Sequence, residues 1–282
     1  MQRRRVTAIP DASASKALIF APQGRDAAIA AALLNEASIA STICPNLLAF
    51  RQALGDEASF AVVTEEALLT AGFRDIALWV EAQLSWSDLA FIILTRRGGG
   101  PERNPAAARL LSEVLGNVTF LERPFHPTTF ISVARTALKG RLRQHEARTR
   151  MEELHEGEAR LRTAFRVGRL GSWALDTASS TLMPSAAFKS FFGRAAEEPF
   201  AYEELLASVH PDDRARVQAT LRSSIETGID YAIEHRNVWP DGSVHWIEAR
   251  ARLARDRRGG RPRLVGVCSD ITIRKTAEEE EP

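Results

Sequence analysis

The chain has 282 residues, of which 45% are hydrophobic and 26% are charged. A chain of this length usually forms about two domains, and this composition excludes wholesale disorder. The 37 basic and 36 acidic side chains give a net charge of +1, so charge gives no reason to expect a nucleic acid or an anionic membrane as the main partner.

Cysteine usage and hydropathy indicate which cellular compartment to expect. Cys44 and Cys268 are the two cysteines, and they lie far apart in the sequence, which argues against a disulfide framework. No apolar run approaches the roughly 20 residues that a membrane-spanning helix needs. We therefore expect a cytoplasmic protein without a membrane partner, and a flexible N-terminus over residues 1–13.

Strand-like apolar runs alternate with helix-like segments over the first half of the chain. The runs cover residues 16–21, 39–44, 60–64, 89–95 and 118–121. Helix-like segments separate them, and a further helix begins near Pro127. This alternation predicts an α/β domain over residues 14–135, with a doubly wound, five-stranded parallel sheet covered by helices on both faces.

Two places in this half carry a family resemblance. The stretch LERPFHP at 121–127 resembles the Lys-Pro-Phe turn after the fifth strand of receiver domains in two-component signalling. Thr95 ends the fourth strand-like run, where receivers place a phosphate-contacting Thr or Ser. The resemblance implies a flavodoxin-like fold and a phosphate-accepting site at the strand ends.

The residues that receiver chemistry requires are missing. Receivers use a carboxylate nucleophile, an acidic pair that holds Mg²⁺, and a lysine. Here Gln23 lies where the acidic pair belongs, Thr64 takes the nucleophile position, and Arg123 replaces the lysine. The sequence therefore predicts a pseudo-receiver whose degenerate site comprises Gln23, Thr64, Glu65, Thr95 and Arg123. The alternative is a phosphate-accepting response regulator that uses Glu65 or Thr64.

A long helix is expected from Pro127 to Phe165, with a connector over residues 136–163. Heptad spacing runs along it, with good apolar occupancy only from Ala147 onward. The residues at this spacing are Ala137, Gly140, Gln144, Ala147, Met151, Leu154, Glu158, Leu161 and Phe165. We expect a parallel homodimeric coiled coil through Ala147, Met151, Leu154, Leu161 and Phe165. The alternative is a single solvated helix that packs on its own domains.

The second half has a different pattern of elements. Two short strands are expected over 170–183, followed by short helices and a longer one ending at Thr227. Three further strands are expected at 230–239, 244–254 and 264–273, and the first two alternate apolar and polar residues. This order predicts a five-stranded antiparallel sheet over residues 164–275.

Three motifs give this half its resemblance. HPDDR at 210–214, PDGSVHW at 240–246 and LVGVCSDIT at 264–272 resemble a PAS domain with a C-terminal PAC motif. The resemblance implies sensing or dimerisation rather than catalysis, so we expect no enzyme activity in this chain. It also implies that Asp270, Ile271 and Thr272 carry the signal to a following helix. Residues 276–282 would then be the start of an output linker or a flexible tail.

The sequence indicates the residues of a ligand pocket less specifically than it indicates the fold. Trp173, Phe188, Phe191, Phe192 and Leu205 are candidates to line it, with an ordinary core role as the alternative. Cys268 does not lie in the Asn-Cys-Arg helix motif of flavin-photosensing PAS domains, and no His, Cys, Asp or Glu cluster has metal-ligand spacing. We predict no cofactor, and we keep an unidentified small-molecule ligand open.

The combined pattern resembles the N-terminal sensory part of a bacterial PAS-containing sensor histidine kinase. It predicts a non-catalytic sensory or regulatory module whose partners are a second copy and either another signalling protein or a C-terminal output domain. The alternative is a fragment of a sensor kinase whose catalytic domains lie beyond Pro282.

Overall fold

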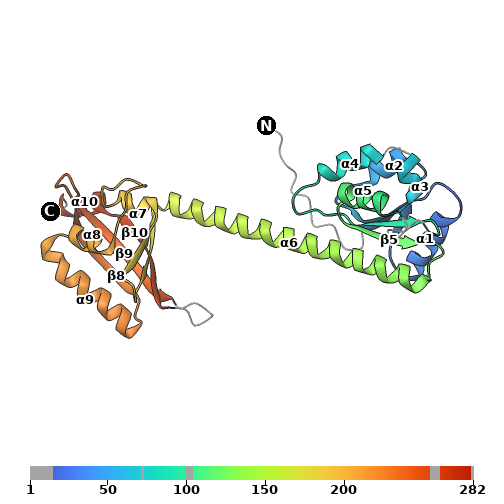
Figure 1. The fold of residues 1–282 in the computed structure, drawn as a ribbon. Coiled ribbons are helices and arrows are strands. Elements are labelled where there is room, and N and C mark those ends of the chain that lie inside the picture. The colour runs from blue at the N-terminus through green and yellow to red at the C-terminus, as the bar shows by residue number, and fades with distance from the viewer. Residues whose placement is uncertain (1–14, 71–72, 99–103, 255–260, 281–282) are drawn as a thin grey trace. The chain divides into compact units, whose positions relative to one another are not determined.

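The computed structural model of this protein describes residues 15–70, 73–98, 104–254 and 261–280 (Figure 1). The predicted flexible segment 1–13 lies outside these residues. The chain divides into two compact units, residues 1–155 and residues 156–282.

Unit 1 contains a five-stranded parallel sheet. Its strands are β1 (Lys16–Phe20), β2 (Ser41–Ile43), β3 (Ala58–Thr64), β4 (Phe91–Thr95) and β5 (Val118–Glu122), in the order β2-β1-β3-β4-β5. Every residue of β3 and β4 is buried, as expected of strands covered on both faces. The predicted parallel α/β sheet is thus confirmed.

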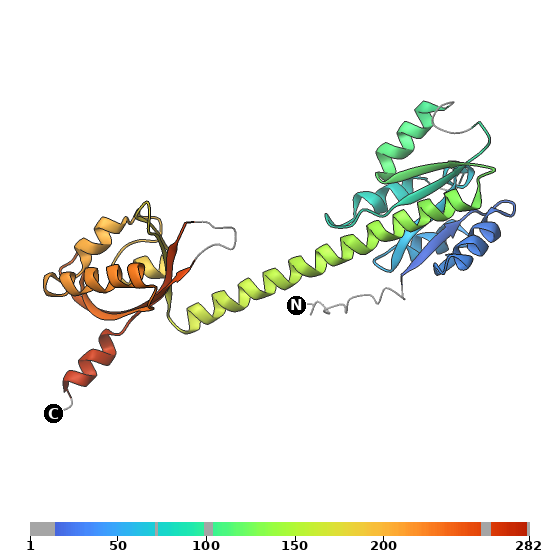
Figure 2. The same ribbon diagram turned by 90° about the horizontal axis from the view of Figure 1, so that it is seen from below.

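Helices cover both faces of this sheet. They are α1 (Asp26–Glu36), α2 (Leu47–Ala53), α3 (Glu65–Thr70), α4 (Phe73–Glu81), α5 (Pro105–Leu115) and the first part of α6 (Pro127–Val167). Helices α1 and α6 pack on one face, and α2 to α5 pack on the other (Figures 1 and 2). The sheet is therefore doubly wound, as predicted.

A buried arginine fixes helix α6 to unit 1. Arg141 is only 3% exposed, and its Nε donates to the carbonyl oxygen of Ala58 at 3.1 Å. Its Nη1 donates to Ser87 Oγ at 2.8 Å. The ring of Trp86 lies 5.2 Å from this guanidinium and 4.4 Å from that of Arg148. These charge-assisted hydrogen bonds and cation–π contacts tie α6 to the start of β3 and to the loop before β4.

The heptad stripe of α6 changes its environment along the helix. Ala137 packs in the core of unit 1, and Gln144 exchanges hydrogen bonds with the backbone of Asp88. From Ala147 onward the stripe is largely uncovered. Met151 is 56% exposed, Leu154 67% and Leu161 61%, while Ala147 is exposed and Phe165 is half-buried. Only the second part of the stripe is thus open to a partner.

Unit 2 contains a five-stranded antiparallel sheet. Its strands are β6 (Gly171–Asp176), β7 (Thr181–Pro184), β8 (Tyr231–Val238), β9 (Val244–Ala254) and β10 (Arg263–Asp270). They pair in the order β7-β6-β10-β9-β8, and every pair is antiparallel. The predicted antiparallel sheet is confirmed.

Helices α7 (Ala186–Ser190), α8 (Tyr202–Ser208) and α9 (Pro211–Thr227) accompany this sheet, and their apolar residues share one core with it. The last strand was expected to continue to Ile273, but it ends at Asp270. The Asp270 carboxylate accepts the backbone N–H of Thr272, which starts helix α10 (Thr272–Glu280) at that point.

Two glycines allow close contacts in unit 2. A Cβ atom on Gly266 would lie 2.3 Å from the carbonyl oxygen of Arg250 on the neighbouring strand. A Cβ atom on Gly171 would lie 2.5 Å from Phe188 Cα, so a side chain there would separate α7 from β6. Both positions require glycine because backbone atoms already occupy the space of a side chain.

We expect Arg141→Ala to destabilise unit 1 by about 2–4 kcal/mol. The change removes several charge-assisted hydrogen bonds and leaves the carbonyl of Ala58 without its partner in a buried position. The measurement is the free energy of opening from native-state amide exchange of β3. Arg143→Ala, on an exposed residue of the same helix, is the matched control and should change this free energy by less than about 0.5 kcal/mol. Equal effects of the two substitutions would contradict the docking role.

Candidate functional site

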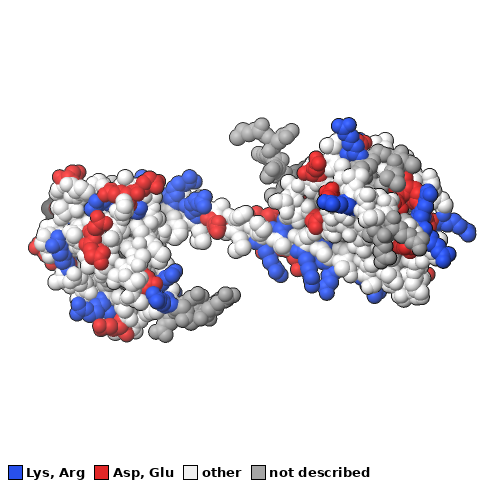
Figure 3. Space-filling view, viewed as in Figure 1, with Lys and Arg blue, Asp and Glu red and all other residues white. Residues whose placement is uncertain are grey.

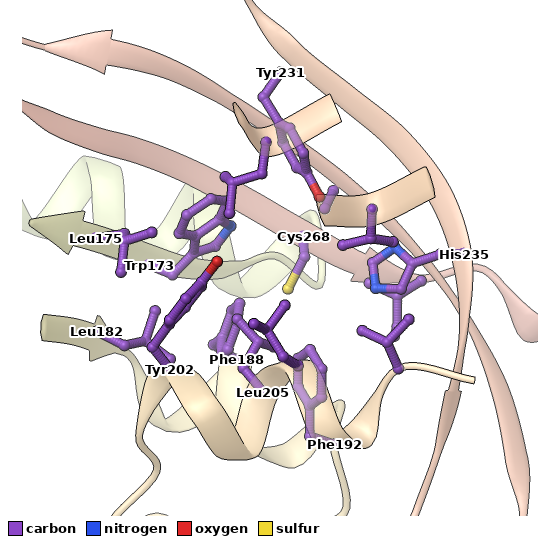
Figure 4. Close-up of a pocket in the computed structure, with 16 residues that line it drawn as sticks. Trp173, Leu175, Leu182, Phe188, Phe192, Tyr202, Leu205, Tyr231, His235 and Cys268 are labelled. Carbon is purple, nitrogen blue, oxygen red and sulfur yellow. The ribbon is translucent and has the colours of Figure 1, made fainter. Parts of the chain in front are cut away.

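Unit 2 encloses a small cavity between its sheet and its helices (Figure 4). The cavity has a volume of about 40 Å³. Its lining is mainly apolar, and strands β6, β8 and β10 and helix α8 also place polar side chains against it. Those polar residues are Trp173 on β6, Tyr202 on α8, Tyr231 and His235 on β8, and Cys268 on β10.

Two polar atoms in this lining are buried and lack a hydrogen-bond partner among the described residues. They are Trp173 Nε1 and His235 Nδ1. Buried polar groups are normally paired with protein or with ordered water, and an unpaired one costs stability. Burial also raises the pKa of the Tyr231 hydroxyl and of the Cys268 thiol, so both stay neutral at physiological pH. The cavity therefore offers uncharged hydrogen-bonding groups within an apolar wall.

The cavity size limits what it holds in this conformation. A volume of about 40 Å³ suits one or two water-sized groups, since one water occupies about 30 Å³ of liquid. Pockets for drug-sized ligands measure roughly 300–1,000 Å³. A larger ligand would have to move the helices that cover the sheet.

Four of the five predicted pocket residues line this cavity, namely Trp173, Phe188, Phe192 and Leu205. Phe191 does not line it. Phe191 lies at the C-cap of α7, and its carbonyl oxygen accepts a hydrogen bond from Trp239 Nε1. Four of the predicted residues thus line the cavity, and the fifth instead binds the β8–β9 hairpin through its carbonyl oxygen.

Sequence reasoning found Trp173 but missed the other polar residues of the lining, namely Tyr202, Tyr231, His235 and Cys268. Tyr231, Ile233, His235 and Asn237 alternate along β8, and all four are buried. That period of two already indicated one inward face. A polar residue at an inward position was the signal that could have identified His235 as a cavity residue.

His235 is held neutral by its surroundings. Burial lowers the pKa of this imidazole from 6.5 to about 4, and the nearby carboxylate of Asp213 only partly opposes this shift. For Asp213 itself, burial would raise the pKa, but hydrogen bonds from Arg236 and Arg216 outweigh burial and hold that pKa far below its usual range. The Asp213–Arg236 pair thus joins α9 to β8 close to the cavity.

The HPDDR motif has a structural role in this unit. His210 precedes α9, and its backbone N–H donates to the carbonyl oxygen of Arg236 at 2.8 Å. Arg214 donates from Nε to the Val209 carbonyl and from Nη2 to the Ala207 carbonyl. These bonds hold the α8–α9 corner and set the start of α9.

Asp270, Ile271 and Thr272 join the sheet to α10. The backbone N–H of Ile271 donates to the Trp246 carbonyl oxygen at 2.8 Å, and Thr272 Oγ1 accepts the backbone N–H of Trp246 at 2.9 Å. Ile271 is buried. The three predicted output residues therefore tie the first turn of α10 to β9.

Charged residues secure the next turn of α10. The Glu234 carboxylate on β8 pairs with Arg274 at 2.6 Å and with Lys275 at 2.9 Å. Lys275 Nζ also lies 5.4 Å from the centre of the Trp246 ring. Helix α10 is thus anchored to two strands, β8 and β9, that contribute residues to the cavity.

A second hollow lies on unit 1, at the carboxyl ends of its strands. Its lining is Gln23, Gly24, Asp26, Thr64, Glu66, Arg96, Arg97 and Arg123. Three of the five predicted degenerate-site residues, Gln23, Thr64 and Arg123, meet here. Glu65 starts α3 without lining the hollow, and the buried Thr95 contributes its carbonyl oxygen, which accepts from Arg123 Nε at 3.1 Å.

An ion-pair network fills the back of this hollow. The Arg123 guanidinium donates from Nη1 to the Asp26 carboxylate and from Nη2 to the Glu66 carboxylate. Arg96 also donates to Glu66. Burial would raise the pKa of Glu66, but its bonds to Arg96 and Arg123 lower it, so the carboxylate stays ionised. Sequence reasoning missed Asp26, Glu66, Arg96 and Arg97, although all four closely follow the ends of parallel strands.

Among the described residues, no three His, Cys, Asp or Glu side chains are arranged to hold a metal ion. Within the same residues, no helix is long and apolar enough to cross a membrane. On the visible face, basic and acidic side chains are interspersed over each unit (Figure 3).

Comparison with known proteins identifies the second unit. Residues 182–268 match the family described as PAS fold. This segment is a PAS domain. A blue-light-activated histidine kinase of Brucella anthropi is 28% identical over 137 residues, which is 49% of this chain and 27% of that protein. The sensor protein FixL of Bradyrhizobium diazoefficiens is 31% identical over 109 residues, 39% of this chain and 22% of that protein.

A solved structure is also similar. A sensory box histidine kinase/response regulator from Burkholderia thailandensis is 31% identical, covering 43% of this chain and 90% of that chain, with a TM-score of 0.37. The family match and the curated relatives show that the PAS domain is related to sensor histidine kinases. The matched part spans only about a quarter of the curated relatives. The family match lies in unit 2, so the receiver-like identity of unit 1 stays a prediction.

We expect acid to destabilise the PAS domain through His235. The folded-state pKa of about 4 lies below the ordinary 6.5, so the unfolded chain takes up the proton first as pH falls. Between pH 6.5 and 4 this group should remove on the order of 3 kcal/mol from the free energy of unfolding, and above pH 6.5 its contribution is constant. Urea titrations of the wild type across this range measure the loss.

The substitution His235→Gln should remove most of this pH dependence, because glutamine does not titrate. The matched control is His155→Gln, which changes an exposed histidine on α6. An equally steep loss of stability in His235→Gln and in the wild type would refute the assignment.

Proposed function

We propose that this chain is a non-catalytic sensory module of two-component-type signal transduction. The PAS domain detects a small molecule and passes the change to a second signalling protein or an output domain through α10. The observation that carries this proposal is the cavity with unpaired polar atoms, Trp173 Nε1 and His235 Nδ1, inside the domain. We place the protein in the cytoplasm, with neither nucleic acid nor membrane as its partner.

Neighbouring residues connect the cavity to α10. Ile247 and Cys268 line the cavity, while Trp246 and Asp270 hold the first turn of α10. On β9 the two roles fall on consecutive residues, and on β10 they lie two residues apart. A ligand that shifts β9 or β10 would therefore change the bonds that start α10. Such coupling requires two states of the sheet with different ligand affinity.

The ligand class follows from the lining. The polar groups that face the cavity are neutral, and the remaining wall is apolar. An ionised ligand would lose its hydration without gaining an opposite charge, which is costly in a buried site. We therefore propose a small uncharged molecule that offers a hydrogen-bond acceptor to Trp173 Nε1.

Unit 1 acts in this proposal as a receiver-like domain that is not phosphorylated. Thr64 lies at the strand end where a carboxylate would be required, and a hydroxyl without an activating base is a weak nucleophile. The neighbouring carboxylates, Asp26 and Glu66, are engaged by Arg123. We assign unit 1 a docking or dimerisation role.

The open part of the α6 stripe supports a homodimer. Met151, Leu154 and Leu161 are more than half exposed at heptad spacing, and burying each side chain is worth about 1.5–3 kcal/mol. Away from this stripe, Arg148 pairs with Glu152 and Arg160 with Glu156 along the same helix. An apolar stripe at this spacing, interrupted at Glu158, fits a second copy of the same helix, and a parallel pairing would place Leu154 of both copies against each other.

The sensing proposal predicts that the freshly purified protein releases a small neutral molecule on denaturation. Ala249→Leu should abolish this release, because Ala249 lines the cavity and a larger side chain would fill it. Mass spectrometry of the denatured extract measures the amount per chain, and amide exchange of α10 reports the coupling.

Ala232→Leu is the matched control, since Ala232 is an exposed residue of β8 on the opposite side of the strand. It should leave both the bound molecule and the exchange of α10 unchanged. The sensing proposal would be contradicted by a wild-type protein that releases no molecule and whose α10 amides exchange at the same rate as those of Ala249→Leu.

A further inference from the structure

The hollow on unit 1 has properties that its proposed docking role does not use. It has a volume of about 520 Å³ and is open to solvent-sized groups. It lies at the carboxyl ends of β1 and β3, where the strand order β2-β1-β3-β4-β5 reverses direction. Open parallel α/β sheets bind their ligands at this topological switch point, because the loops diverge there.

The charge of the hollow favours an anion. Three arginines, Arg96, Arg97 and Arg123, face two carboxylates, Asp26 and Glu66, which leaves one excess positive charge. Both carboxylates already pair with arginines of the protein, since both accept hydrogen bonds from Arg123 and Glu66 also accepts one from Arg96. A cationic ligand would therefore compete with guanidinium groups that are already in place.

The guanidinium of Arg123 is fixed before any ligand arrives. Its Nε donates to the Thr95 carbonyl oxygen, and its two Nη atoms donate to Asp26 and Glu66. These bonds use three of the five N–H groups of an arginine, so two remain for a ligand. A pre-ordered guanidinium loses little side-chain entropy on binding, which favours bidentate contact with an oxyanion.

The rim of the hollow supplies further donors. Arg96 lines the hollow, is 71% exposed and uses its Nε for Glu66. Arg97 is exposed beside it. Helix α1 also begins here, and the side chain of its N-cap residue, Arg25, makes no capping hydrogen bond. The first backbone N–H groups of α1 carry partial positive charge, and Asp26 in the same first turn offsets part of it.

We propose that this hollow binds a phosphate group non-covalently, with Arg96, Arg97 and Arg123 as its ligands. The phosphate can belong to a free inorganic anion or to the end of a nucleotide, because both present the same oxygens to the arginines. This site is independent of the PAS cavity, which takes an uncharged ligand, and it requires no phosphorylation of Thr64 or Glu65.

Calorimetric titration of the full chain with pyrophosphate and with ADP, at constant ionic strength, tests this proposal. Both probes should bind, and amide exchange should slow at residues 21–28 and 95–97. Equal affinity would assign recognition to the phosphates alone, and tighter binding of ADP would assign the site to a nucleotide. Both results support the proposal.

Arg96→Gln and Arg97→Gln should each weaken binding by about tenfold or more, since each removes charge-assisted hydrogen bonds to the anion. Both residues are exposed, so the fold should survive. Arg109→Gln is the matched control, because Arg109 is an exposed arginine of α5 that pairs with Glu113. Absence of binding at millimolar concentrations of both probes, or equal weakening in all three variants, would overturn the proposal.

Discussion

The packing of helix α6 on unit 1 depends on the hydrogen bonds of the buried Arg141 guanidinium. This guanidinium donates to Ala58 on a central strand and to Ser87 before the next strand. These bonds fix the rotation of α6 about its own axis, because a buried arginine cannot leave its acceptors without a large cost. That rotation determines which side of α6 packs on unit 1, whereas the heptad stripe beyond Ala147 lies in a stretch where residues 150–156 and 158–164 are all exposed.

The two units use charge in opposite ways. In the PAS domain, burial keeps His235, Tyr231 and Cys268 neutral around a small cavity, so recognition there rests on shape and single hydrogen bonds. In unit 1, carboxylates hold Arg123 in place at the strand ends and leave a positive excess. One chain thereby offers two chemically distinct sites, one suited to an uncharged molecule and one suited to an oxyanion. Helix α6, which begins in one unit and ends in the other, is common to both.

Local patterns predicted the fold well because they are set by short-range physics. Pro127 marked the start of α6, and Asp270 with Thr272 marked the start of the following helix, although the strand before that helix was predicted too long. The sites were predicted less completely. Gln23, Thr64 and Arg123 were found through a motif, but the partners of Arg123 come from α1 and α3, and no local pattern reveals which side chain a guanidinium will reach. The volume of the cavity likewise depends on how closely the helices pack on the sheet, which no local pattern reveals.

Disulfide trapping of α6 tests the pairing of two copies most directly. Leu154→Cys places a thiol on the open stripe, whereas Glu156→Cys places one on the opposite side of the helix, and the native Cys44 and Cys268 are buried. Under mild oxidation we predict a covalent dimer for Leu154→Cys and a monomer for Glu156→Cys, because only the former residue faces its own copy in a parallel coiled coil. Equal cross-linking of the two variants, or none in Leu154→Cys, would contradict this account.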